Sequence, residues 1–124
     1  TRAYVREFSA AVAALNTSKS SAQSAPLVVI FPPAYNLSAF HEELLKSGAQ
    51  SAAQVKMEFR PQNIHFAKDG AYTGEISPAV VKTMGAQWAL IGHSERRTLF
   101  NENDELIAKK VQSALASQLT PMLC

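Results

Sequence analysis

The sequence predicts an α/β protein in which parallel strands alternate with helices. Short apolar runs typical of strands recur along the chain, and amphipathic stretches with helical spacing lie between them. The strands are roughly thirty residues apart, which is the repeat length of a βα unit, and such units build parallel sheets. With 124 residues, of which 47% are hydrophobic and 18% charged, the chain has the size and composition of a single domain, residues 1–124.

The first half of the chain is expected to form a helix, a strand and a second helix. An apolar stripe at helical spacing opens the chain: Val5, Phe8, Val12 and Leu15. A linker rich in serine and alanine follows at 16–25, and "PLVVIF" at 26–31 is predicted to be a buried strand that prolines terminate. The stretch 36–48 carries leucine and phenylalanine on one face and ends at a glycine, which indicates a helix. No element is assigned to "AQSAAQVKMEFRP" at 49–61.

The second half is expected to contain three strands and two helices. The strands are predicted at 62–67, 88–92 and 119–124, and the helices at 77–84 and 101–117. Ser77 is a typical N-cap with Pro78 at the first helical position, and Gly85 is a typical stop. The last helix carries an apolar stripe made of Leu106, Ile107, Val111, Ala114 and Leu115. The run "QNIHFA" at 62–67 alternates only weakly, and a glycine-containing loop follows it at 68–75.

Composition argues against several classes of protein. The formal net charge is +2 and the basic residues are scattered, so a nucleic-acid partner is not expected. Cys124 is the only cysteine, which excludes an intrachain disulfide and a cysteine-based metal cluster, and it is expected to be a small core residue. No apolar run is long enough to cross a bilayer, and the first residues lack the apolar core of a signal peptide. We therefore expect a cytoplasmic protein that has no membrane partner.

The stretch "WALIGHSERR" (88–97) places a histidine, a serine, a carboxylate and two arginines directly after an apolar strand. In α/β proteins the carboxyl ends of parallel strands hold catalytic side chains on a rigid scaffold. The alternative is that these residues have no catalytic role, because many strands end in solvated charged residues and a lone histidine is more often structural than catalytic. Composition alone favours this alternative.

Two segments carry a resemblance to a known family. "GAYTGEISP" (70–78) and "MGAQWALIGHSERRTLFNENDELIAKKV" (84–111) resemble the middle of triosephosphate isomerase, a (β/α)₈ barrel enzyme of glycolysis, and the similarity extends from about Leu27 to Cys124. The resemblance implies a partial TIM barrel with four parallel strands, the family's strands two to five, and alternating helices. A complete barrel of this type has about 250 residues.

The resemblance also implies site residues. His93 corresponds to the family's neutral electrophile, which donates hydrogen bonds to the oxygens of an enediolate. Triosephosphate isomerase is the standard example of this role, so the role of His93 is implied by the resemblance alone. Glu95 resembles the family's loop carboxylate beside the active site, and Ser94 lies between the two. The substrate would be a small phosphorylated triose, with dihydroxyacetone phosphate and glyceraldehyde 3-phosphate interconverted in glycolysis and gluconeogenesis. No cofactor and no metal ion are expected.

Thr73, Gly74 and Glu75 occupy the loop that in this family contacts the active site of a neighbouring subunit, so a homodimer is implied. From spacing alone this loop is an exposed glycine turn. Four residues are expected to belong to a structural ion-pair network: Glu75, Arg96, Arg97 and Glu102. His41 is expected at the surface of its helix. His65 has no evident partner, and its distance from other histidines in the sequence does not indicate a metal site.

Several family features lie outside the matched residues. These are the first strand with its asparagine and substrate-binding lysine, the proton-abstracting glutamate, the closing lid and the glycine-rich phosphate loops. The 124 residues alone are therefore expected to be inactive. An alternative is a truncated half-barrel that only self-associates; a phosphate-binding module is a weaker alternative, because neither a P-loop nor a dinucleotide fingerprint is present. The chain also departs from the family at "RPQN" (60–63), where "GAQN" is usual, and at Asn101, where glycine is usual.

Overall fold

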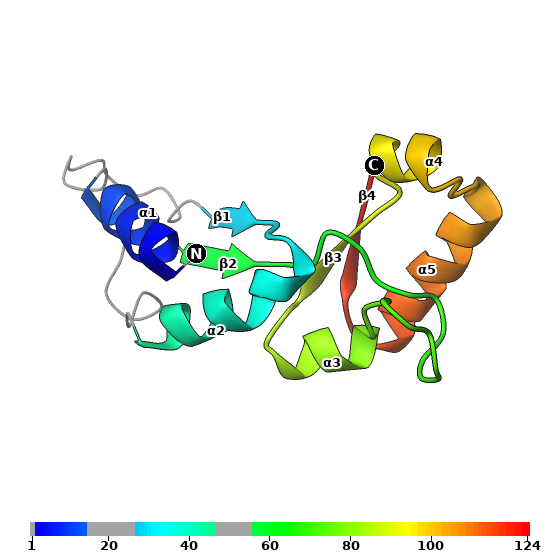
Figure 1. Ribbon diagram of the computed structural model, residues 1–124, viewed down its shortest axis with the longest axis horizontal. Coiled ribbons are helices and arrows are strands. Elements are labelled where there is room, and N and C mark those ends of the chain that lie inside the picture. The colour runs from blue at the N-terminus through cyan, green and yellow to red at the C-terminus, as the bar shows by residue number, and fades with distance from the viewer. Residues whose placement is uncertain (1, 15–26, 47–55) are drawn as a thin grey trace, which may run out of the picture. The chain divides into compact units, whose positions relative to one another are not determined.

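The computed structural model describes residues 2–14, 27–46 and 56–124 (Figure 1). The predicted linker 16–25, Leu15 and most of the unassigned stretch 49–61 lie outside these ranges. The chain divides into two compact units, one formed by Thr1–Ile30 and Tyr35–Phe59 and the other by Phe31–Ala34 and Arg60–Cys124. The single domain predicted from the length is not tested by this division and stays a prediction.

The first unit contains two helices, two strands and a 3₁₀ turn. The elements are α1 (Arg2–Ala14), β1 (Leu27–Ile30), η2 (Ala34–Asn36, at the boundary between the units), α2 (Leu37–Lys46) and β2 (Lys56–Phe59). Strands β1 and β2 pair in parallel, with Leu27 opposite Lys56 and Ile30 opposite Phe59. Helix α2 packs on both α1 and β2. The helix–strand–helix order expected for this half is confirmed.

A small apolar core and one buried carboxylate hold the first unit together. The core residues are Val5, Leu37, Phe40, Leu44, Met57 and Phe59, all less than 9% exposed. Arg6 donates two hydrogen bonds, of 2.7 and 3.1 Å, to the two carboxylate oxygens of Glu43, and the bond from Arg6 lowers the pKa of Glu43. His41 is half-buried with its ring centre 5.8 Å from that of Phe59, so it lies less on the surface than expected.

The second unit contains α3 (Pro78–Thr83), β3 (Trp88–Ile91), α4 (Ser94–Leu99), α5 (Asp104–Ala116) and β4 (Thr120–Leu123). Strands β3 and β4 pair in parallel, with Trp88 opposite Thr120 and Ile91 opposite Leu123. Helix α5 packs on both strands (Figure 1). The parallel α/β arrangement is confirmed. The described strands form two separate pairs, β1–β2 and β3–β4, so one four-stranded partial barrel stays a prediction.

Burial along β3 alternates as expected for a strand with one face against helices. Ala89 and Ile91 are at most 1% exposed, whereas Trp88 and Leu90 are only half-buried. One face of β3, with Ala89 and Ile91, is therefore buried, and the other, with Trp88 and Leu90, is partly open to solvent. Helix α5 covers the buried face, because its residue Ile107 reaches the end of β3.

The strand predicted at 62–67 is wrong. The strand observed in this part of the chain is β2, which lies in the stretch left unassigned, and 62–67 is irregular. Pro61 lacks the N–H needed to continue a ladder, which explains why β2 ends before it. Beyond this proline, the His65 N–H donates to the Ile76 carbonyl at 2.8 Å and so pairs with a loop residue.

The helix caps follow the sequence closely. Ser77 Oγ accepts from the Val80 N–H at 3.4 Å, and Asn103 Oδ1 accepts from the Leu106 N–H at 2.9 Å, which starts α5 slightly later than predicted. Asn101 has a φ of 54°, in the left-handed region that asparagine tolerates better than most residues. Replacement of the family's usual glycine by asparagine is therefore compatible with the same backbone.

Two expectations about burial are wrong. Cys124 is exposed rather than part of a core, because it follows the last residue of β4 and no described element covers it. Leu115 is 59% exposed, whereas its neighbour Ala114 is fully buried. The buried face of α5 therefore includes Ser113 and Ala114 and excludes Leu115.

Candidate active site

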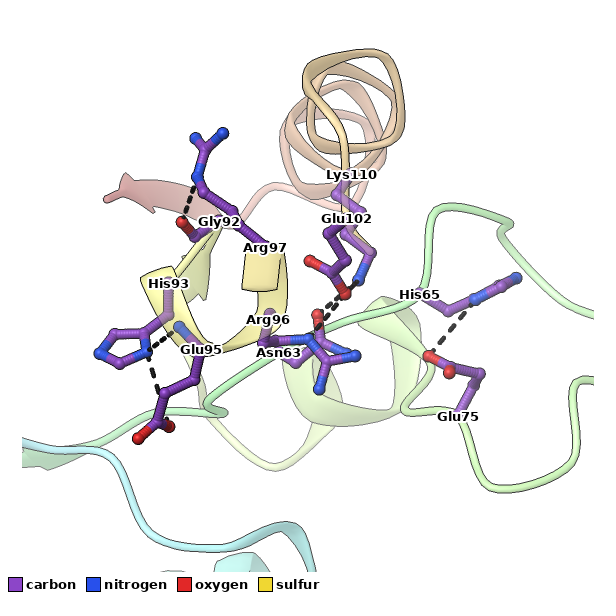
Figure 2. Close-up of polar contacts among 10 residues, drawn as sticks. All are labelled: Asn63, His65, Glu75, Gly92, His93, Glu95, Arg96, Arg97, Glu102 and Lys110. Atoms are coloured by element: carbon purple, nitrogen blue, oxygen red, sulfur yellow. Dashed lines mark hydrogen bonds and ion pairs between the residues drawn. The ribbon is translucent and has the colours of Figure 1, made fainter. Parts of the chain in front are cut away.

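His93 lies immediately after β3, where the strand ends and the short helix α4 begins. It is the N-cap of α4, with φ −54° and ψ 142°, and its ring nitrogen Nδ1 accepts a hydrogen bond from the Glu95 N–H at 3.4 Å (Figure 2). A nitrogen that accepts a bond carries no proton. In the neutral ring the proton is therefore assigned to Nε2, which leaves Nε2–H as a donor.

Residues 94–99, to which the sequence assigns no helix, form α4, and this helix gives His93 its geometry. The main-chain N–H groups of Arg96 and Arg97 donate to the His93 carbonyl at 2.9 and 3.1 Å. The ring, by contrast, binds the N–H of Glu95 within the same turn. Both the backbone and the side chain of His93 are thus held by α4.

The three residues predicted to be catalytic are adjacent but differently placed. The side chain of His93 is 44% exposed and that of Glu95 is 75% exposed. Glu95 Oε2 lies 3.7 Å from His93 Nδ1, which is too long for a hydrogen bond. Ser94 is exposed at the first position of α4. Glu95 therefore contacts the histidine most directly through its main-chain N–H.

A cleft of about 450 Å³ lies beside His93. Its other lining residues are Phe31, Gln62, Leu90, Glu95, Arg96 and Phe100. Gln62 donates from Nε2 to the Phe31 carbonyl at 2.9 Å, which joins two segments that form the wall of the cleft. Sequence reasoning missed Phe31 and Gln62 as site residues, although "RPQN" was singled out. A cavity of about 530 Å³ beside α3 and α5 contains none of the predicted site residues.

A buried ionic network joins Arg96, which lines the cleft, to Glu102, Lys110 and Asn63 (Figure 2). Glu102 Oε1 accepts from Arg96 Nε at 2.6 Å and from Lys110 Nζ at 2.5 Å, and Lys110 also donates to Asn63 Oδ1 at 2.7 Å. Glu102, Lys110 and Asn63 are each less than 9% exposed. The guanidinium of Arg96 also lies 4.5 Å from the centre of the Phe100 ring.

The network pairs one buried carboxylate, that of Glu102, with two cationic side chains, Lys110 and Arg96. Burial opposes ionisation of Glu102, but hydrogen bonds from Lys110 and Arg96 outweigh it, so the pKa of Glu102 lies below its ordinary value. Of the four residues predicted to share an ion-pair network, Arg96 and Glu102 do pair with each other, whereas Arg97 pairs with Asp104. Lys110 and Asn63 were missed, although a signal existed for Lys110: it lies three residues after Ile107, on the stripe that faces the core.

The loop of Thr73, Gly74 and Glu75 is an exposed turn. The Glu75 N–H donates to the Tyr72 carbonyl at 2.9 Å, and Gly74 has a φ of 85°, which favours glycine. The expectation that His65 lacks a partner is wrong. Its Nδ1 lies 3.4 Å from Glu75 Oε2, and its ring centre lies 4.1 Å from that of Tyr72, with the two ring planes tilted by 37°. In this chain Glu75 therefore pairs with a histidine.

The described residues carry two further observations on ligands and membranes. Among them, no three His, Cys, Asp or Glu side chains are grouped in a way that could hold a metal ion. None of the helices in the described ranges is long and apolar enough to cross a membrane. The predictions of no metal ion and no cofactor stay predictions.

Comparison with known proteins gives one consistent family. A family model described as triosephosphate isomerase matches residues 2–124. A triosephosphate isomerase of Acidithiobacillus ferrooxidans is 46% identical over 99 residues, which are 80% of this chain and 35% of the relative. One of Lactobacillus delbrueckii subsp. bulgaricus is 48% identical over 96 residues, 77% of this chain and 35% of the relative. One of Clostridium botulinum is 43% identical over 97 residues, 78% of this chain and 36% of the relative. The chain thus spans 35% to 36% of the length of these relatives.

Proposed function

This chain belongs to the triosephosphate isomerase family, and we propose that its activity is the interconversion of dihydroxyacetone phosphate and glyceraldehyde 3-phosphate through an enediolate. The chain spans about 35% of its relatives, so the activity is proposed for a polypeptide that carries the whole family barrel. Its place would be in glycolysis and gluconeogenesis, in the cytoplasm, without a cofactor.

The reaction moves a proton between two carbons next to a carbonyl. A base removes the proton from one carbon, negative charge develops on oxygen, and the proton returns one carbon over. A donor aimed at the two oxygens lowers this barrier. A neutral imidazole suits that task, because its acidity is close to that of the enediol that it serves.

The bond from the Glu95 N–H to His93 Nδ1 is the observation that carries the proposal. It selects the neutral tautomer that has its proton on Nε2, on the ring edge away from Glu95 (Figure 2). His93 also lines the cleft of about 450 Å³, where a small phosphorylated triose could bind. We therefore assign His93 the role of neutral electrophile.

Glu95 and Ser94 stay proposed site residues with lesser roles. The Glu95 carboxylate is mostly exposed and lies 3.7 Å from Nδ1, so it adds negative charge beside the ring without a hydrogen bond to Nε2. Ser94 only begins α4. The base, the lysine, the lid and the phosphate loops correspond to family segments outside the matched residues, so residues 1–124 alone are proposed to be inactive.

The quaternary arrangement is likewise proposed from family membership. Thr73, Gly74 and Glu75 would contact the partner subunit of a homodimer, and their exposure in this chain is compatible with that role. A second candidate is the truncated half-barrel that only self-associates. It is favoured by exposed apolar side chains on two strands, namely Leu27 of β1 at 45% and Leu123 of β4 at 61%.

The proposed role of His93 is tested by His93→Gln in the complete polypeptide. We expect kcat to fall by about 100-fold or more, with KM changing less, because the lost donor acts mainly in the transition state. His41→Gln is the matched control, since His41 packs against Phe59 in the other unit, and it should leave both parameters unchanged. An unchanged kcat in the His93 variant would make this histidine structural.

A further inference from the structure

Arg97 joins three segments around the end of β3. Its Nε donates to the Gly92 carbonyl at 2.7 Å, and its Nη2 donates to the Cys124 main-chain oxygen at 3.1 Å (Figure 2 shows the first bond). Its Nη1 donates to Oδ1 of Asp104, the first residue of α5, at 2.7 Å. Gly92 and Cys124 each follow the last residue of a strand, so one guanidinium bridges the ends of the neighbouring parallel strands β3 and β4.

Gly92 shows how closely this arrangement is packed. Its φ is +77°, where a side chain is strained. A Cβ at this position would lie 3.2 Å from Arg97 Nη2, 3.3 Å from Ile107 Cδ1 and 3.4 Å from the Cys124 oxygen. A side chain at residue 92 would therefore push directly on the guanidinium.

The bonds of Arg97 lie on both sides of His93. The side chain holds the Gly92 carbonyl, which belongs to the same planar peptide unit as the His93 N–H. The Arg97 main-chain N–H donates to the His93 carbonyl at 3.1 Å. Because the peptide unit before His93 and the carbonyl after it are both held by one residue, the direction in which the imidazole leaves the backbone depends on Arg97.

We propose that Arg97 is a positioning residue for His93, acting through the Gly92 and Cys124 carbonyls rather than through its ion pair with Asp104. The inference rests on the proposed role of His93 and adds a residue to it. A planar guanidinium can donate along three directions at once, whereas a lysine ammonium is a single point on a flexible stem. Arg97→Lys should therefore keep the positive charge but lose the simultaneous hydrogen bonds to the Gly92 and Cys124 oxygens.

The control comes from the third bond of the same guanidinium. The Asp104 side chain is 93% exposed, so Asp104→Asn removes the charge of the pair while both carbonyl contacts remain. If the ion pair were what matters, Asp104→Asn would resemble Arg97→Lys. If the carbonyl bridge matters, only Arg97→Lys should affect His93.

The first readout is the tautomer of His93, followed by ¹⁵N NMR of the histidine rings in the complete polypeptide. The wild type and Asp104→Asn should show one neutral tautomer with the proton on Nε2, and Arg97→Lys should show a mixture of tautomers. The second readout is kinetic. Arg97→Lys should lower kcat by between about 10- and 100-fold with little change in KM, as expected for a misplaced catalytic group, while Asp104→Asn leaves both unchanged.

The two readouts separate this inference from the proposed function. Ring signals of His93 that are unchanged in Arg97→Lys would overturn the positioning role, whatever the activity. A wild type without isomerase activity, together with mixed tautomers in Arg97→Lys, would refute the proposed function and support the positioning role. If neither Arg97→Lys nor Arg97→Gln gives a cooperative thermal transition, Arg97 serves global stability, and the positioning role is refuted.

Discussion

Glu102→Gln is expected to destabilise the second unit strongly, because it leaves a buried ammonium without its counter-charge. The side chains of Glu102 and Lys110 are each 3% exposed. Removing one partner of a buried ion pair costs about 3 to 5 kcal/mol of unfolding free energy. Asn63 keeps its 2.7 Å bond to Lys110, and the Arg96 side chain, 24% exposed, retains some contact with water. The expected loss is therefore at the lower end, about 3 kcal/mol, which is a large part of the 5 to 15 kcal/mol typical of a domain.

The assay is urea unfolding at neutral pH, with the slope m compared between variants so that a change in midpoint reports stability. Glu105→Gln is the matched control, because it breaks the exposed pair with Lys109 on the same helix and should not shift the midpoint measurably. The double variant Glu102→Gln/Lys110→Met should recover part of the loss, since no charge is then left unpaired. A loss below about 1 kcal/mol in Glu102→Gln would refute the reasoning, since that is the value of an exposed pair.

Three further outcomes are expected. The pKa of Glu102 is lowered in the folded chain, so the stability that its ionised form contributes is present above the ordinary pKa of 4.5 and is lost as the pH falls through the folded-state pKa. Urea midpoints measured as the pH is lowered through this range should therefore fall in the wild type and change less in Glu102→Gln. Gln118 follows α5 with a φ of 58°, a left-handed backbone conformation that glycine adopts more easily than glutamine. Gln118→Gly should therefore raise the unfolding free energy by about 0.5 to 1 kcal/mol in thermal or urea unfolding. An unchanged unfolding free energy would show that this conformation carries no strain. Residues 1–124 alone should sediment as oligomers or aggregates because strand edges are left unpaired, and a sharp monomer with a cooperative transition would contradict the half-barrel interpretation.

The parts of the fold that the sequence predicted are those specified by neighbouring residues. Ser77 with Pro78 predicted the start of α3, and the residues from Trp88 to Ile91 predicted β3, because a cap or an apolar run acts within a few residues of itself. The helix α5 was also predicted, although its exact start was set by Asn103. In each case the chemistry that fixes the element lies inside the element.

The parts that the sequence did not predict depend on pairing or on buried charge. Strand β2 alternates polar and apolar residues from Lys56 to Phe59, so a strand signal was present and was missed. With only four residues, this strand is defined mainly by its pairing with β1, which lies far away in the sequence. Helix α4 is short and polar, and it contains no apolar stripe to reveal it. Cys124 was placed in a core from its residue type alone, although burial depends on what covers the end of β4.

The candidate site contains both local and long-range contacts, and the sequence motif could predict only the local ones. The bond between His93 Nδ1 and the Glu95 N–H spans two residues, so the contact from which the tautomer is inferred lies within the motif itself. The bond between Lys110 and Asn63 spans 47 residues and exists only when the second unit is folded. The tautomer of His93 should therefore depend mainly on the local turn and on Arg97. The wall of the cleft, by contrast, should respond to any change that loosens the buried network, because Arg96 belongs to both. Loss of activity with an intact His93 tautomer would indicate damage to the cleft, and loss of the tautomer in a stable protein would indicate damage to the turn.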